Sequence, residues 1–324
     1  MKKYSQSIIA FILFCIILLL ISFSKEAKAG AIQGIELCEG IIIPSLLPVL
    51  IVSNSLIRLK SSPLSAILFG LISGYPAGAV LTCALYNDGV ISSKEAERIM
   101  SFNFCGGCAF IISAVGSIIY KSATAGVILF ASCVLSSIII ALFRFPLKSF
   151  KQKEKASNSV NLSNALCAAT ESAVKSIAVM SAYIILFSAL LGIITIPKWA
   201  TPLIEITNGI CDSKTLIPLP FCAFFLSFGG LCIHFQLLPF LNKMKIKYYV
   251  FLFYRLLGAS LSFFICKIIM LFFPNTELAS ASLAQTVPFE ASKLGSGLSM
   301  IMIIGCAVVV FDLENRKQSL LHNA

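Results

Sequence analysis

The chain has 324 residues, of which 58% are hydrophobic and 12% are charged, and its formal net charge is +11. A soluble domain is nearer half apolar and a quarter charged, so this composition excludes a soluble protein and predicts an all-α, polytopic membrane helix bundle. The excess of 25 basic over 14 acidic residues is typical of loops that face anionic lipid, and does not indicate nucleic acid as a partner.

About eight or nine hydrophobic segments follow one another, each near the roughly 20 residues that a helix needs to cross a bilayer. They are residues 4–24, 40–57, 61–87, 99–120, 122–143, 176–197, 215–242, 248–273 and 294–311.

The N-terminus has two interpretations. Lys2 and Lys3, an apolar run and Ala27-Lys28-Ala29 together resemble a signal peptide with its cleavage site. The apolar run is longer than the ~7–15 residues usual in signal peptides, and charges crowd the cleavage site. We therefore expect an uncleaved first membrane helix within residues 1–29.

The third segment contains the stretch GLISGYPAGAVLTCALYNDG, whose centre, Ser73-Gly74-Tyr75-Pro76, suits a helix poorly. Backbone can unwind at membrane depth only where it is buried in protein or lines a cavity, so the break indicates either a packing kink or a substrate site. Charge favours a re-entrant hairpin, because a full crossing would place the cationic linker outside. That linker contains Arg144, Lys148, Lys151, Lys153 and Lys155.

A short amphipathic helix is expected after this hairpin. Asn87-Asp88-Gly89 is typical of a turn, and Ser92 with Glu95 forms a capping-box pattern. Cys105 and Cys108 then form a C-x-x-C pair, which indicates either a thiol-redox site or two small residues beside Gly106-Gly107. We expect no metal and no cofactor.

The two halves of the chain show weak internal similarity. Residues 36–57 correspond to 174–192, and LISGYPAGAV corresponds to FLSFGGLCIHFQ at 225–236. Paired Gly/Pro-interrupted segments are typical of inverted-repeat transporters. The predicted organisation is a first helix (1–29), a first repeat (30–143), a basic cytoplasmic linker (144–172), a second repeat (173–313) and a polar tail (314–324).

Polar residues near the second break are further candidates for the site. His234, Gln236 and Asn208 are either site members or packing residues, and Arg255 is either a substrate cation or a side chain that extends to the interface. The chain has no recognisable phosphate-binding loop, zinc-protease motif or nucleophile elbow, which disfavours an enzyme.

Several stretches resemble the YlbJ-type sporulation integral membrane proteins of the nucleoside-recognition (Gate) group. They are GIIIPSLLPVLI, ISGYPAGA, LYNDGVISSKEAERIMSF, GGCAFIISAVG, IEITNGI and SFGGLCIHFQ. The resemblance implies a role in spore formation, in the cell membrane or the mother-cell-derived outer forespore membrane, moving dipicolinate toward the forespore. The chain departs from the family pattern at Asn103-Phe104-Cys105-Gly106-Gly107-Cys108, where a more polar loop is usual.

We thus predict a transporter of a small organic anion that works in the lipid bilayer, with a homo-oligomer as a possibility. A transporter of nucleosides or other solutes, a thiol-redox protein using Cys105 and Cys108, and a non-transporting scaffold are the alternatives. The predicted substrate-binding residues are Ser73, Gly74, Tyr75, Pro76, Gly78, Asn103, Asn208, Ser227, Gly229, Gly230, His234, Gln236 and Arg255.

Overall fold

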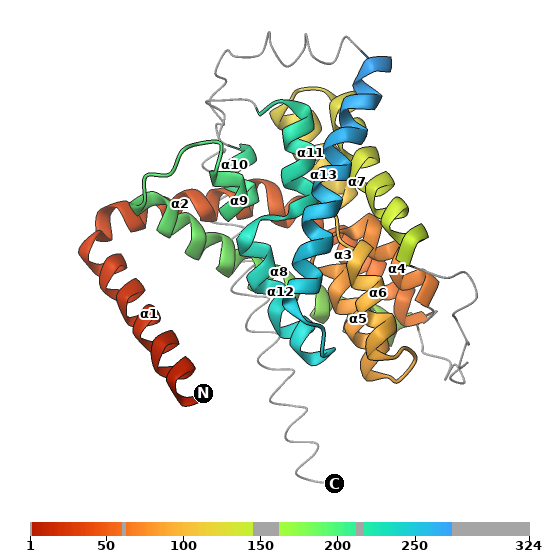
Figure 1. Ribbon diagram of the computed structural model, residues 1–324, viewed down its shortest axis with the longest axis horizontal. Helices are drawn as coiled ribbons and strands as arrows, with labels where there is room; N and C mark the ends of the chain where they lie inside the picture. Colours follow the sequence, from red (N-terminus) through yellow and green to blue (C-terminus); the bar gives the residue numbers. More distant parts are fainter. Residues whose placement is uncertain (1, 60–62, 145–161, 212–216, 274–324) are drawn as a thin grey trace.

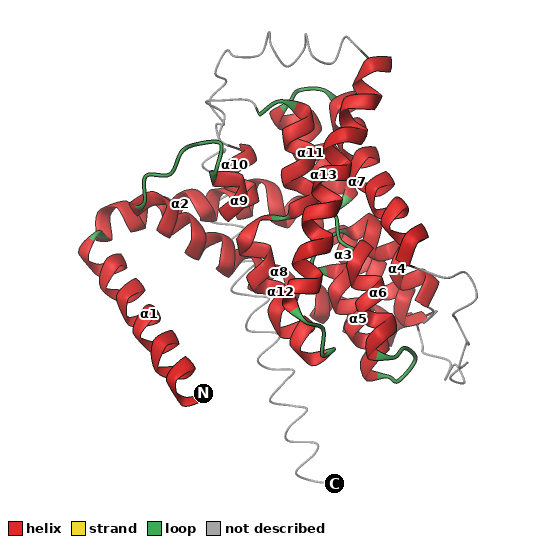
Figure 2. Cartoon of the chain, viewed as in Figure 1, coloured by secondary structure: helices red, strands yellow, loops and turns green. Residues whose placement is uncertain are grey.

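The computed structural model describes residues 2–59, 63–144, 162–211 and 217–273, and this part of the chain contains helices and turns but no strand (Figures 1 and 2). The predicted all-α fold is confirmed. The hydrophobic segment 294–311, the tail 314–324 and most of the linker 144–172 lie outside the described residues.

Five stretches are long and apolar enough to cross a membrane, as a polytopic membrane protein requires. They are Ser24–Ser55, Ala123–Arg144, Ser163–Ile193, Leu219–Lys243 and Tyr248–Phe272. The structure also has shorter apolar helices. The five long stretches make the protein an integral membrane protein.

The N-terminal part of the chain is almost continuously helical. Helix α1 (Lys2–Ser22) is followed at once by α2 (Ser24–Leu37), which continues through the π-helical turn η1 (Cys38–Ile42) into α3 (Ile43–Leu59). Residues 25–39 lie between the first two predicted hydrophobic segments, and residue 29, the predicted end of the first helix, falls inside α2. Ala and Glu are the most frequent residues of this stretch, and both favour helix.

Small residues explain why α2 lies so close to α8 (Leu162–Ile193). A Cβ atom at Gly34 would lie 2.8 Å from the Ser188 hydroxyl oxygen, and one at Gly30 would collide with the Ser188 carbonyl. A glycine every fourth residue lets two membrane helices approach until their backbones touch. Segment 25–39 is thus a packed part of the bundle.

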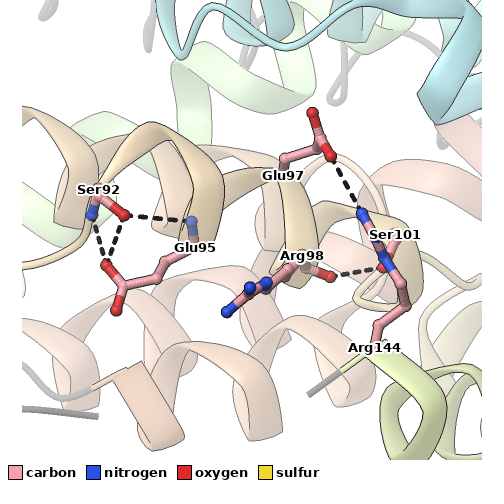
Figure 3. A network of polar contacts seen from close by, with 6 residues as sticks. All are labelled: Ser92, Glu95, Glu97, Arg98, Ser101 and Arg144. Carbon is pink, nitrogen blue, oxygen red and sulfur yellow. Dashed lines mark hydrogen bonds and ion pairs between the residues drawn. The ribbon is translucent and has the colours of Figure 1, made fainter. Parts of the chain in front are cut away.

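The predicted break at Ser73-Gly74-Tyr75-Pro76, in the third hydrophobic segment, is confirmed. Helices α4 (Pro63–Ser73) and α5 (Ala77–Asn87) are separated at Gly74, which has a φ of 77°, and they pack against one another. The next helix, α6 (Ser93–Phe102), begins with the expected capping box, in which Ser92 and Glu95 bond each other's backbone N–H groups (Figure 3).

The predicted single span over residues 99–120 is wrong. α6 ends at Phe102, residues 103–107 are not helical, and η2 (Ala109–Ile119) follows Cys108. The sequence concealed this break because Phe104, Cys105 and Cys108 keep the run apolar around Gly106-Gly107. Hydropathy reports the length of an apolar run, and says nothing of its continuity.

The second half begins, after α7 (Ala123–Arg144) and α8, with the two short helices α9 (Thr201–Ile204) and α10 (Ile206–Cys211). The expected break at Gly229 is confirmed and separates α11 (Leu219–Phe228) from α12 (Gly230–Lys243), and α13 (Tyr248–Phe272) follows. The division into two inverted repeats stays a prediction.

Hydrogen bonds between distant segments define two ends of the bundle. At one end, which we call the Ser93 side, the Ser93 hydroxyl donates to the carbonyl oxygen of Met244 at 2.7 Å, and Glu97 pairs with Arg144 at 3.0 Å (Figure 3). At the other end, the Tyr120 side, the Tyr120 hydroxyl donates to the carbonyl oxygen of Ile217. Helix α7, about 33 Å long at 1.5 Å per residue, joins the two sides.

The distribution of charge assigns these sides. The Ser93 side carries Arg144 together with Lys243, Lys245 and Lys247, whereas Lys121 lies at the Tyr120 side. By the positive-inside rule, we predict that the Ser93 side faces the cytoplasm. The segment 243–247 therefore lies on the same side as the start of the basic linker.

This topology predicts opposite labelling of two exposed positions, Lys121 and Lys245. In a background with the exposed Cys15 and Cys167 replaced by Ser, a membrane-impermeant maleimide should label Lys245→Cys only after permeabilisation. It should label Lys121→Cys in sealed cells. Labelling of both positions, or neither, in sealed cells would contradict the topology.

Candidate functional site

Four interruptions of the helices meet inside the bundle, and they associate in two pairs. In the first pair, the Tyr75 amide donates to the carbonyl oxygen of Cys105 at 2.9 Å, which joins the α4–α5 break to the α6–η2 break. A Cβ at Gly74 would collide with the backbone of Gly106 and Gly107, so only glycine fits there.

The second pair joins the α9–α10 break at Glu205 to the α11–α12 break. A Cβ at Gly230 would lie 3.0 Å from the carbonyl oxygen of Pro202 and 3.3 Å from the amide nitrogen of Ile206. Gly229 and Gly230 both have positive φ, at 91° and 69°, a conformation that glycine adopts without strain. The α9–α10 break was not predicted from the sequence.

The two pairs touch through aromatic rings. The rings of Tyr75 and Phe104 lie 4.9 Å apart between centroids. A Cβ at Gly229 would lie 2.9 Å from the Phe104 ring and 3.8 Å from the Tyr75 ring. Tyr75 and Gly229, two of the predicted substrate-binding residues, therefore lie close together.

A small cavity of about 20 Å³ lies where the two pairs meet. Tyr75 and Gly107 line it from the first pair, Glu205 and Thr207 from the second, and Gln236 from α12. This volume accommodates about one water molecule. The buried Tyr75 hydroxyl has no hydrogen-bond partner among the described residues.

Glu205 is the ionisable group of this cavity, and its side chain is fully buried. Its carboxylate accepts hydrogen bonds from the Thr207 amide at 2.9 Å and from the backbone and side-chain amides of Asn208, both at 2.6 Å. These bonds occupy the free N–H groups at the start of α10. Our predicted residues included Asn208 but not Glu205 or Thr207; the signal was an acidic residue in the otherwise uncharged stretch IEITNGI.

A larger cavity of about 890 Å³ lies toward the Tyr120 side. Its lining includes Ser188, Lys198, Trp199, Thr201, Asn208 and Ile217. Asn208 contributes to its wall and donates a hydrogen bond to Glu205, which lines the small cavity. The Asn208–Glu205 contact thus separates the two cavities.

Two predicted residues hold α4 in place. The Ser73 hydroxyl donates to the Ser53 hydroxyl at 2.6 Å, and the Asn103 side-chain amide donates to the carbonyl oxygen of Ala66 at 3.3 Å. Asn103 fills the space left by Gly70 and Gly78, and its side-chain oxygen, also buried, has no partner among the described residues. Neither Ser73 nor Asn103 lines the small cavity.

His234 lies behind the second pair of breaks. Its Nε2 lies 3.0 Å from the Phe228 carbonyl oxygen, and its Nδ1 lies 3.1 Å from the Tyr248 hydroxyl. Because a carbonyl only accepts, Nε2 carries the proton and donates, while Nδ1 accepts from Tyr248. His234 thus caps the end of α11. Ser227 is buried against Gly258, and the Gln236 amide donates to the Cys232 sulfur.

Arg255 occupies a similar position at the first pair. Its guanidinium donates to the carbonyl oxygens of Ser101 and, at 2.7 Å, of Phe104, and it stacks on the Phe104 ring at 4.4 Å. The side chain is 1% exposed, so it does not extend to the interface. Arg255 instead bonds the free carbonyls at the end of α6.

Comparison with known proteins gives a distant relationship. The chain is 26% identical over 175 residues to the sporulation integral membrane protein YlbJ of Bacillus subtilis, and is a distant relative of that family. The aligned region covers 48% of this chain and 42% of the relative, so the match spans less than half of the relative's length. No protein-family model and no solved structure matches the chain.

The Arg255 contacts predict a mainly structural role. Arg255→Lys keeps the charge but loses the two-pronged contact, so it should lower the free energy of unfolding by about 1–3 kcal/mol. The thermal midpoint in detergent measures this loss, with Lys267→Met, at an exposed position of the same helix, as the control. A normal midpoint combined with lost ligand binding would instead make Arg255 a substrate cation.

Proposed function

We propose that this protein is a membrane transporter for a small organic anion, and that it moves dipicolinate toward the forespore during sporulation. The observation that carries the proposal is the meeting of four helix interruptions, three of which contribute residues to the wall of one buried cavity. Interrupted helices at membrane depth are typical of transporter binding sites, because their free backbone groups can bind a substrate.

The choice of substrate rests on chemistry and on the family resemblance of the sequence, whereas the relative's name indicates only a role in sporulation. Dipicolinate is a rigid aromatic dianion, which needs hydrogen-bond donors, a cation and an aromatic surface. The larger cavity is lined by the cation of Lys198 and by Trp199, whose ring carries an N–H donor, and the small cavity is lined by the Tyr75 ring. The small cavity is far smaller than such a ligand, so substrate binding there requires the two pairs of breaks to move apart.

The thiol-redox alternative has less support from the structure. The Cys105 thiol is fully buried and donates to the carbonyl oxygen of Leu71 at 3.2 Å. Burial raises the pKa of this thiol to about 12. The reactive thiolate is therefore strongly disfavoured at neutral pH.

Replacing both Cys105 and Cys108 with Ala should therefore leave dipicolinate uptake into proteoliposomes close to that of the unmodified protein. The residues beside Gly106-Gly107 need to be small, and no step of transport needs a thiol. A matched double variant at Cys15 and Cys167, which are exposed, controls for general loss of thiols. Loss of uptake only in the Cys105/Cys108 variant, at normal protein level, would revive the redox role.

Glycine substitutions test the site itself. Gly74 and Gly89 have similar positive φ values, 77° and 70°, but a Cβ at Gly74 collides with Gly106 and Gly107 whereas nothing lies within 4 Å of one at Gly89. Gly74→Ala should therefore abolish dipicolinate uptake, while Gly89→Ala, which carries the same backbone strain, should retain it.

Bulkier variants extend this comparison to the second pair of breaks. Gly229→Leu and Gly74→Leu should both abolish uptake while the protein still inserts into the membrane, as measured by its abundance in membrane fractions. Normal uptake by either leucine variant would show that the breaks are packing kinks and that substrate binds elsewhere.

A further inference from the structure

The Glu205 carboxylate has an unusual environment for a group at membrane depth. It lies between the spans Ser163–Ile193 and Leu219–Lys243, is fully buried, and accepts its hydrogen bonds from uncharged amides. An ionisable side chain inside a membrane protein is costly and generally marks the route of an ion or a proton.

The titratable groups that face Glu205 are all neutral in their ordinary protonated forms. They are Cys38 of η1, Cys211 of α10, Cys232 of α12 and Tyr75. Helix α8 contributes the Ser188 hydroxyl through Asn208, η2 and α9 carry no titratable residue, and the charged residues of α2 are exposed. None of these neighbours supplies a positive charge to balance the carboxylate.

We propose that Glu205 is a proton-binding site, which holds a proton while the two pairs of breaks are closed together and releases it when they open. The location provides the route, because Glu205 lines the small inner cavity while its partner Asn208 lines the larger cavity on the Tyr120 side. A proton therefore has a path that crosses one contact, between Asn208 and Glu205.

The neighbouring groups can accept the change. When Glu205 is a carboxylate, Asn208 donates to it at 2.6 Å. After protonation the carboxyl needs an acceptor, and a half-turn of the Asn208 amide presents its oxygen to the new O–H group. The buried Tyr75 hydroxyl in the same cavity, which lacks a partner among the described side chains, offers a second acceptor.

The proton site itself does not depend on the proposed transport function. Its coupling to the binding of an anion does. While the breaks are closed, a neutral Glu205 does not repel an anion in the adjoining larger cavity, so proton and dianion should bind together in this state and each should strengthen the binding of the other. The same carboxylate, when ionised, would oppose a dianion in the adjoining cavity.

Burial raises the pKa of Glu205 above its usual value of 4.5, because desolvation outweighs the hydrogen bonds from Asn208 and Thr207. The folded protein thus holds this proton more tightly than the unfolded chain. The resulting stabilisation is present below pH 4.5 and is lost as the pH rises through the raised pKa.

The test is the pH dependence of the thermal midpoint of the purified protein in detergent. The unmodified protein should lose stability as the pH rises above 4.5, and Glu205→Gln, which resembles the protonated form, should lack this loss. Glu171→Gln, at an exposed position on α8, should behave as the unmodified protein. An equal loss of stability in Glu205→Gln would overturn the proposal.

A second variant guards against misfolding of Glu205→Gln. Asn208→Ala removes a donor that stabilises the carboxylate, so the loss of stability should move to higher pH. No shift, or a shift to lower pH, would contradict a proton on Glu205. Stabilisation by sodium ions at fixed pH in the unmodified protein, absent in Glu205→Gln, would replace the proton with sodium and also overturn the proposal.

Proton uptake separates this proposal from the transport function. Addition of dipicolinate to the weakly buffered protein should draw protons from solution, as read by a pH indicator, and Glu205→Gln should take up none. If stability falls with rising pH as expected, but dipicolinate is not taken up into proteoliposomes, the proton site is supported and dipicolinate is rejected as the substrate. Dipicolinate uptake that is unchanged by pH in both proteins would reject the proton site alone.

Discussion

The structure depends on one constraint, which is that backbone N–H and C=O groups freed by an interrupted helix inside a membrane must find partners within the protein, at a cost of several kcal/mol for each that does not. Each of the four breaks meets it with a different group. Cys105 receives the Tyr75 amide, Arg255 bonds the carbonyls at the end of α6, Glu205 bonds the amides of α10, and His234 bonds the last carbonyl of α11.

This constraint explains why ionisable residues occur where hydropathy alone would exclude them. Arg255 and His234 lie in long apolar helices, yet their charged or polar atoms contact backbone carbonyls of other helices. Glu205 differs from these two because it also lines a cavity. It therefore combines a capping role with a place in the cavity wall, which is why it carries the functional inference.

Several features could be predicted from the sequence because local chemistry decides them. Gly74 with Pro76, Gly229 with Gly230, and Ser92 with Glu95 each specify a break or a cap through backbone geometry and a nearby hydrogen bond. Two others could not. Segment 25–39 packs against α8 because Gly30 and Gly34 admit that helix. The break at residues 103–107 lies where Arg255, about 150 residues away in the chain, bonds the carbonyl oxygens of Ser101 and Phe104.

The candidate site shows the same division between local and distant causes. Tyr75 and Gly229 are both predicted site residues, and the Phe104 ring lies against each of them. Glu205 was not expected, since its importance comes from the meeting of α9–α10 with Tyr75, Gly107 and Gln236. The two pairs also differ in shape: α4 and α5 pack side by side, whereas α11 and α12 follow one another within the single stretch Leu219–Lys243. Opening of the small cavity therefore requires least rearrangement if α12 moves with the α9–α10 break, to which Gly230 is packed, and leaves the first pair intact.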